Sequence, residues 1–216
     1  MLVEYRMSRN PITVPPTMPI GQAQALMREK KVHRFPVVDA KGKLVGIVSE
    51  SDLLNAGPSS VTTLSIWEVT YMLSQISVGQ VMTRKLITVD EDCPIEEAAR
   101  LMRQHNIGGT PVVRNGDLVG IITESDIFDV FLELLMAGEP GVRVTALAPY
   151  FKGSMAQITS AVTARGGMIH AFNTFRGEDE KTWGCMLKVA EISRQDLIDA
   201  LTPLVVRILN VVDVSS

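Results

Sequence analysis

The sequence predicts an α+β protein in which two similar βαββα repeats are followed by a different βαββαβ segment. Three observations support this fold class. One stretch of the chain is repeated further on. Within each copy, short apolar runs typical of strands alternate with helical spacing of apolar residues. A Gly- and Pro-containing break at residues 138–141 then separates the repeats from a segment that does not match them.

The repeat is recognised by several motifs in the same order. Met7 aligns with Met82 and, at the same spacing, Ile12-Thr13-Val14 with residues 87–89 and Pro36-Val37-Val38 with residues 111–113. After the loss of one residue near Gly42 and Gly116, GIVSESDLL (46–54) aligns with GIITESDIF (120–128). Each copy therefore contains the same elements.

The first copy shows the order of these elements. Residues 12–14 form a short strand, and a helix begins near Pro19, with Ala23, Leu26 and Met27 at helical spacing. Residues 35–38 and 44–49 read as two strands around a short turn containing glycine, which indicates a hairpin. A second helix starts after the hydroxyl residue Ser49. The apolar character of the hairpin strands predicts that they are buried on both faces.

A linker helix is expected between the copies. Residues 55–60 are rich in turn formers, and the apolar residues that follow recur near one helical face: Ile66, Val69, Leu73 and Ile76. This helix would pack on the core or on a second subunit. The predicted domains are repeat 1 (1–55), the linker helix (56–80), repeat 2 (81–137) and a last domain (141–216).

The last domain has its own pattern. Strands are predicted at residues 142–148, 168–175, 183–189 and 205–212. One helix follows Gly153-Ser154 and buries Met155, Ile158 and Val162, and another runs from Ser193 to Leu201. The order βαββαβ is the ferredoxin-like arrangement.

Composition excludes several function classes. The chain has 216 residues, a net charge of −3 and 46% hydrophobic residues, without a basic segment that would favour nucleic acid or an anionic membrane. Residues 1–14 lack the apolar core of a secretory signal, and Cys93 and Cys185 have no metal or disulfide spacing. We therefore expect a cytoplasmic protein without a metal site.

The paired signature at Ser49–Asp52 and Thr123–Asp126 has two interpretations. A hydroxyl followed three residues later by an acid is a capping box, and similar patterns occur at Ser154–Gln157 and Ser193–Asp196. The other interpretation is a ligand site, because each pair lies where a buried strand ends and a helix begins. Asp is shorter than the usual Glu, so a carboxylate left free there would accept hydrogen bonds from the two hydroxyls of a ribose.

Residues 1–137 resemble a tandem pair of CBS domains. The motifs that carry this resemblance are ITV, the x-Pro-Val-Val strand and Gly-Ile-[Val/Ile]-[Ser/Thr]-x-x-Asp, each present twice. The resemblance implies two clefts between the repeats that bind AMP, ADP, ATP or S-adenosylmethionine as a regulatory ligand. Asp52 and Asp126 would hold ribose, and Ser49 and Thr123 would assist. The adenine slot would be lined by residues around Ile12-Thr13 and Ile87-Thr88, by those just before Pro36 and Pro111, and by these prolines.

The two clefts are not expected to be equal. The first copy has His33-Arg34-Phe35 before its proline, whereas the second has Gly108-Gly109-Thr110. Arg34 would pair with a phosphate and Phe35 would pack on a base, or these residues are a solvated helix end and a core residue. A small hydroxyl and basic cluster at the second copy is a further candidate for phosphate contact: Thr83, Arg84 and Lys85.

The last domain resembles an ACT domain. The features that support this resemblance are the element order and Gly153 in the first strand-to-helix turn. This resemblance implies dimerisation and, through Lys152, Gly153 and Ser154, a possible small-acid site; the Asp and Pro typical of amino-acid-binding turns are absent. A CBS pair followed by an ACT domain resembles acetoin-utilization CBS–ACT proteins. That family implies a regulator connected with acetoin or related carbon metabolism, whose target protein is unknown.

No catalytic constellation is recognisable. His33, His105 and His170 have no metal-ligand spacing, and no nucleophile elbow or phosphate-binding glycine loop occurs. Three hypotheses follow: a nucleotide-sensing regulator, an oligomerising scaffold whose clefts bind nothing, and an unrecognised enzyme. We expect a regulator without a catalytic cofactor that forms a homodimer.

Overall fold

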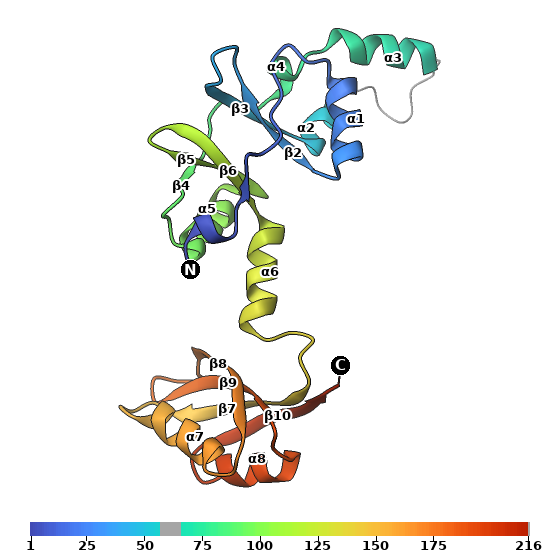
Figure 1. Cartoon of the computed structure of the whole chain (residues 1–216). Coiled ribbons are helices and arrows are strands. Elements are labelled where there is room, and N and C mark those ends of the chain that lie inside the picture. The colour runs from blue at the N-terminus through green and yellow to red at the C-terminus, as the bar shows by residue number, and fades with distance from the viewer. Residues whose placement is uncertain (57–65, 216) are drawn as a thin grey trace. The chain divides into compact units, whose positions relative to one another are not determined.

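The computed structural model describes residues 1–56 and 66–215, and it contains two compact units (Figure 1). The first spans Met1–Phe128 and the second Asp129–Ser216. Part of the predicted turn-rich segment, residues 57–60, and the side chains of Ile66 and Val69 in the linker helix lie outside the described part.

The first repeat forms one helix-flanked hairpin. Its strands β2 (Arg34–Val38) and β3 (Leu44–Ser49) pair antiparallel, as predicted. The other elements of this repeat are η1 (Val3–Tyr5), β1 (Ser8–Arg9), α1 (Ile20–Lys30) and α2 (Glu50–Asn55). The strand predicted at residues 12–14 is reduced to one parallel bridge between Val14 and Val37.

The second repeat has the same hairpin, formed by β5 (Gly109–Arg114) and β6 (Asp117–Thr123). Before it come α3 (Ile66–Gln75), α4 (Val78–Val81), β4 (Val89–Asp90) and α5 (Ile95–His105), and after it α6 (Glu124–Leu134). The predicted linker helix corresponds to α3.

Each hairpin is joined by a segment of the other repeat. Strand β1 of the first repeat pairs antiparallel with β6 of the second, so that Ser8 faces Ile121. In the corresponding place, Thr83 bridges to Ile47 of β3. The two repeats therefore form one folded unit by exchanging their entering segments.

Two glycines make this exchange sterically possible. A Cβ atom on Gly46 would lie 2.4 Å from Sδ of Met82, and one on Gly120 would lie 2.4 Å from Sδ of Met7. Any side chain would therefore collide with the methionine that enters from the other repeat. This contact explains why glycine opens both GI[VI] motifs.

Helical spacing in α1 places its apolar side chains in a core. Ala23 and Met27 are buried against Phe35 and Val48 of the hairpin. The helix ends where Lys31 adopts a left-handed conformation, as Asn106 does after α5. Because both helices end in this way, the chain turns into β2 and β5 at equivalent positions.

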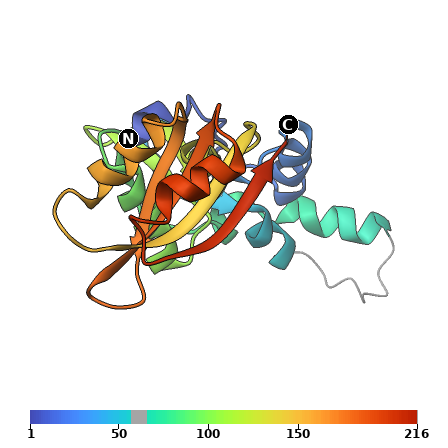
Figure 2. The ribbon, with the colours of Figure 1, turned by 90° about the horizontal axis from the view of Figure 1, so that it is seen from below.

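The second unit has the predicted order βαββαβ. Its elements are β7 (Gly141–Pro149), α7 (Ser154–Thr163), β8 (Met168–Arg176), β9 (Thr182–Ala190), α8 (Arg194–Leu201) and β10 (Arg207–Val214). They form an antiparallel sheet in the order β10-β7-β9-β8. Both helices cover one face of this sheet (Figure 2).

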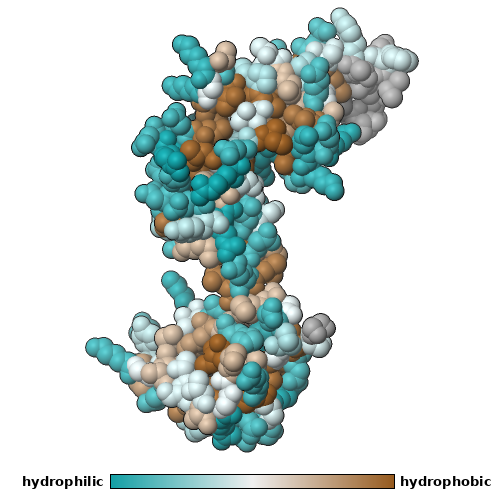
Figure 3. Space-filling view, in the orientation of Figure 1, coloured by the Kyte–Doolittle hydropathy of each residue, from teal (hydrophilic) through white to brown (hydrophobic). Residues whose placement is uncertain are grey.

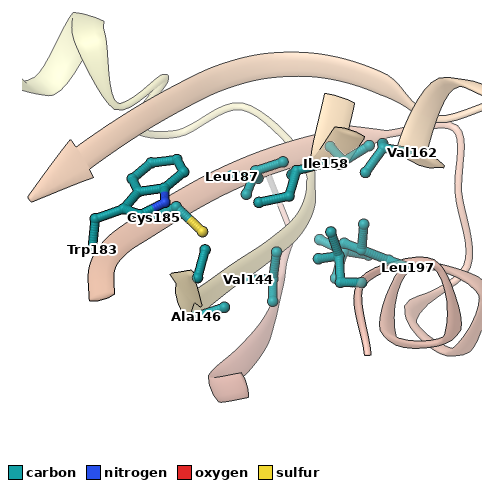
Figure 4. Close-up of a cluster of buried hydrophobic side chains, with 12 residues drawn as sticks. Val144, Ala146, Ile158, Val162, Trp183, Cys185, Leu187 and Leu197 are labelled. Carbon is teal, nitrogen blue, oxygen red and sulfur yellow. The ribbon is translucent and has the colours of Figure 1, made fainter. Parts of the chain in front are cut away.

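The core of the second unit lies between that sheet face and the helices. Figure 4 shows Val144 and Ala146 of β7 beside Cys185 and Leu187 of β9, with side chains of α7 and α8 opposite. The prediction that Met155 faces inward is wrong, since its side chain is 48% exposed. Helical geometry instead places Ser154 inside, and the N-cap of α7 is Gly153, so the Ser154–Gln157 capping box is not formed.

The other sheet face of the second unit receives the residues after α6. The side chain of Lys188, which is 2% exposed, donates a hydrogen bond of 2.6 Å to the carbonyl of Met136. Asn173 donates to the carbonyl of Leu134. These bonds engage one carbonyl at the C-terminal end of α6 and one in the turn that follows it.

Candidate functional site

Asp52 closes a capping box at the start of α2. Its Oδ2 atom accepts hydrogen bonds from the backbone N–H of Ser49 at 2.8 Å and from the Ser49 hydroxyl at 2.6 Å. The backbone N–H of Asp52 donates to the Ser49 hydroxyl at 3.3 Å. Both members of the first signature pair therefore stabilise the helix start.

Asp126 makes the same bonds at the start of α6. Its Oδ2 accepts from the backbone N–H and the hydroxyl of Thr123, both at 2.7 Å. The expectation that the shorter Asp side chain leaves these carboxylates free is therefore wrong. With extended backbone at Ser49, the N-cap groups lie close enough for Asp to reach them. In the described part of the chain, every hydrogen bond to the side chains of Asp52 and Asp126 goes to Oδ2, so Oδ1 retains its acceptor capacity.

A cavity of about 450 Å³ lies next to Asp126, and we name it the Asp126 cleft. Its size is within the range of small-molecule sites. Apolar groups, hydroxyls and charged groups all face it. The lining consists of residues 8–12, residues 31–35, Gly108, Ile121 and residues 123–126.

A second cavity, of about 480 Å³, lies next to Asp52 and is named the Asp52 cleft. It is lined by Arg34, Ile47, Ser49, Ser51, Asp52, Thr83, Lys85, Ile87, residues 106–109 and Pro111. Both acids of the signature therefore face a cavity large enough for a nucleoside.

Each cleft is built from both repeats. The Asp126 cleft combines the capping box of repeat 2 with residues 8–12 and 31–35 of repeat 1. The Asp52 cleft combines the capping box of repeat 1 with the equivalent segments of repeat 2, around residues 83–87 and 106–109. The exchange of entering segments, with β1 on β6 and Thr83 on Ile47, explains this crossed arrangement.

Arg34 lines both clefts and lies against two glycines. A Cβ atom on Gly108 would lie 2.5 Å from Nη2 of Arg34, and one on Gly109 would lie 2.6 Å from Nη1. Burial lowers the pKa of the Arg34 guanidinium, and the charges of Glu124 and Asp52 oppose this effect. The side chain is a half-buried cation near the acids of both clefts.

Most of the predicted site residues line one of the two clefts. Those in the Asp126 cleft lining are Ile12, Arg34, Phe35, Thr123 and Asp126, and those in the Asp52 cleft lining are Arg34, Ser49, Asp52, Thr83, Lys85, Ile87 and Pro111. The structure places five others outside both linings: Thr13, Pro36, Arg84, Thr88 and Thr110. Arg84 donates to the carbonyl of Gly79 at 2.7 Å, and the buried Thr110 hydroxyl donates to the carbonyl of Ile87.

Some cleft residues were not predicted. They include Lys31 and His33 of the Asp126 cleft, and the His33 side chain hydrogen bonds at 2.9 Å to Glu50, which lies outside both linings. Ser125 and Asn106 are further examples. Asn106 aligns with Lys31 in the repeat, so comparing the copies residue by residue would have identified both as one structural position.

The second unit has a wider cavity of about 820 Å³ at the predicted ACT ligand turn. Lys152, Gly153 and Ser154 line it together with the aromatic residues Tyr150, Phe151, Phe175 and Trp183 and with Asp179 and Glu180. Tyr150 is 73% exposed, so much of the lining is open surface. The two smaller clefts differ from it in that each is faced by the acid of a Ser/Thr-x-x-Asp box.

The described residues contain neither a metal-binding cluster nor a membrane-spanning helix. No group of three or more His, Cys, Asp or Glu side chains has an arrangement that would hold a metal ion. In the same part of the chain, no helix is long and apolar enough to span a bilayer.

Two crossed clefts between tandem βαββα repeats, each opening at a Ser/Thr-x-x-Asp box, define a class of paired-repeat modules. The CBS domain family model matches residues 3–59 and 78–133, more than half of the chain. The chain belongs to the CBS domain family, and the predicted tandem CBS pair within an α+β fold is confirmed.

Several solved structures are similar to this chain over the CBS pair. The CBS domain pair of protein MJ0100, in complex with 5′-methylthioadenosine and S-adenosyl-L-methionine, is 32% identical and aligns over 61% of this chain and 95% of its own, with a TM-score of 0.51. A putative acetoin utilization protein (AcuB) from Vibrio cholerae is 35% identical over 65% and 98%, with a TM-score of 0.52. CBSX2 in complex with AMP is 31% identical over 61% and 96%, with a TM-score of 0.50.

Proposed function

We propose that this protein is a regulatory sensor that binds an adenosine-containing ligand in the clefts of its CBS pair. The observation that carries the proposal is the position of Asp52 and Asp126, each of which faces a cavity of nucleoside size from a helix start. Structures similar to this chain contain AMP, 5′-methylthioadenosine and S-adenosyl-L-methionine.

The capping box gives the acid a defined orientation for this role. Because Oδ2 is held by the N–H and hydroxyl of Thr123, Oδ1 of Asp126 is left to accept from ribose hydroxyls. A carboxylate restrained in this way loses less side-chain entropy when ligand binds than a free one would. Capping and ribose binding are then two functions of one side chain.

A thermal-shift panel tests the proposal. AMP, ADP, ATP, S-adenosylmethionine and amino acids would be added separately to the full chain. A ligand at a hundredfold excess over its dissociation constant is expected to add about 2.7 kcal/mol to the free energy of unfolding. If no adenosine compound raises the melting temperature, the second candidate, an oligomerising scaffold with empty clefts and capping-only boxes, is favoured.

The second unit is proposed to be an ACT domain covering residues 141–216, after repeats at 1–55 and 81–137 and a linker helix within 56–80. Support comes from the βαββαβ order and the sheet order β10-β7-β9-β8. Its cavity at Lys152, Gly153 and Ser154 is a candidate small-acid site. The amino acids of the thermal-shift panel test this site.

A role connected with acetoin or related carbon metabolism is also part of the proposal. Its support is the similarity to the putative acetoin utilization protein of Vibrio cholerae, of which 98% is covered. We further propose that the protein is cytoplasmic, non-catalytic and homodimeric and that it acts on a separate target protein. The exposed aromatic side chains of Trp67 and Tyr71, one turn apart on α3, support the dimer.

A further inference from the structure

Arg34 stands at the junction of the two clefts. Among the described residues, the two cleft linings have only Arg34 and Gly108 in common. The guanidinium lies over Gly108 and Gly109, where a side chain of any size would displace it. It interacts electrostatically with Glu124 of the Asp126 cleft and with Asp52 of the other cleft.

The two copies of the repeat differ at the position of Arg34. Arg34 stands two residues before Pro36, and the residue two before Pro111 in the second copy is Gly109. A symmetric pair would have two arginines here, one for each cleft. Of these two equivalent positions, only 34 holds an arginine in this chain. Gly108 and Gly109 of the second copy provide the space that its guanidinium occupies.

The two clefts depend on this cation to different degrees. The Asp126 cleft also contains Arg9 and Lys31, although Arg9 donates to the carbonyl of Glu4 at 3.0 Å. In the described lining of the Asp52 cleft, Lys85 is the one other lysine or arginine. Removal of Arg34 from the Asp52 cleft would therefore take away a large part of its positive charge.

We propose, resting on the nucleotide-binding function above, that Arg34 is shared, so that an anionic ligand in the Asp126 cleft weakens binding of a second anionic ligand in the Asp52 cleft. An arginine fork binds a phosphate through two parallel hydrogen bonds. Once one phosphate has engaged it, a second phosphate in the Asp52 cleft meets neither a free fork nor the unneutralised charge of Arg34, and Lys85 is the cation that remains in the described lining. The coupling is reciprocal, and a ligand without a phosphate does not experience it.

Calorimetric titration of the full chain with AMP and with adenosine tests this inference. Asp126→Ala lowers the affinity of the Asp126 cleft for AMP, so that the Asp52 cleft fills while the other is empty. The AMP dissociation constant of the Asp52 cleft is then expected to be about fivefold or more lower than that of the weaker binding step of the parent. With Arg34→Gln as the background, Asp126→Ala should produce no such tightening. Adenosine should show no tightening in either background.

Arg28→Gln is the matched control, because it removes one exposed arginine of α1 that lines neither cleft. It should retain the coupling, and circular dichroism would verify that all variants fold. Two AMP sites whose affinities are independent, or coupling that persists in Arg34→Gln, would overturn the shared-cation inference alone. If neither AMP nor adenosine binds, the proposed function fails and the inference fails with it.

Discussion

At the scale of single residues, Asp126 is a helix-capping residue whose carboxylate also lines a cleft. The bonds from Thr123 to Oδ2 at 2.7 Å fix the carboxylate at the edge of the Asp126 cleft. The sequence pattern by itself left these two functions as alternatives. The geometry allows both, since Oδ2 accepts the capping bonds and Oδ1 accepts no hydrogen bond from the described residues.

Asp126→Ala is predicted to have two separable effects. Loss of the capping box should lower the free energy of unfolding by about 1 kcal/mol. Loss of a charged hydrogen-bond acceptor should weaken AMP binding in that cleft by about 1.5–3 kcal/mol. Chemical denaturation and calorimetric titration measure the two quantities.

Asp196→Ala provides the matched control. Ser193 caps α8 in the second unit: its hydroxyl donates to Oδ2 of Asp196 at 2.6 Å and accepts from the Asp196 N–H at 3.0 Å, and the pair lines neither cleft. Asp196→Ala removes one of the two kinds of hydrogen bond that Asp126→Ala removes, so it should lose somewhat less stability and keep the parent affinity for AMP. Equal loss of affinity in both variants would show that the effect of Asp126→Ala arises from folding.

Gly120→Ala tests the exchange of segments between the repeats. Its Cβ would lie 2.4 Å from the Met7 sulfur, so the variant should lose about 1–3 kcal/mol of stability through overpacking. The double variant Gly120→Ala/Met7→Ala should lose less than the sum of the two single variants, because the second change removes the collision. Additive losses in a double-mutant cycle of urea unfolding would contradict the contact.

At the scale of elements, local pattern predicted the hairpins and helices well. The apolar runs and glycine turns identified β2–β3 and β5–β6, and helical spacing identified α1 with its buried Ala23 and Met27. The pairing of β1 with β6 could not be read from the chain, because Ser8–Arg9 is a two-residue strand with no periodicity and its partner is far away in sequence. The crossed composition of the clefts follows from that pairing.

The burial of Cys185 within β9 makes a prediction about thiol chemistry. Burial raises the pKa of this thiol to about 11, whereas an unfolded cysteine has a pKa of about 8.5. The free energy of unfolding therefore keeps the full contribution of the protonated thiol below about pH 8.5, and it loses that contribution as the pH rises toward 11. In a Cys93→Ser background, a disulfide reagent at pH 8 should label the native protein far more slowly than the urea-unfolded protein; equal rates would contradict the buried position.

At the scale of the whole molecule, repetition was the strongest signal. Two copies of the same motifs predicted a tandem pair, which the family match at residues 3–59 and 78–133 confirms. Arg34 as a residue common to both clefts was not predicted, because that role arises only when the two copies are brought together. The surface in Figure 3 carries both hydrophobic and hydrophilic patches, and composition alone does not distinguish which of them bind partners.

The proposed homodimer is tested by light scattering coupled to size exclusion. The parent chain should elute at twice its mass of 23.6 kDa. A Trp67→Ala/Tyr71→Ala variant should shift toward the monomer, because it removes two exposed aromatic side chains of α3 that are 82% and 68% accessible. A parent that is monomeric at micromolar concentration would contradict the dimer, and an unchanged variant would place the interface elsewhere.

The most direct test of the central claim is a crystal structure of the full chain grown with AMP. The account predicts adenosine density in at least one of the two clefts, with ribose hydroxyl oxygens within about 2.6–3.2 Å of Oδ1 of Asp52 or Asp126. Empty clefts at saturating AMP, or a ribose that contacts neither carboxylate, would contradict it.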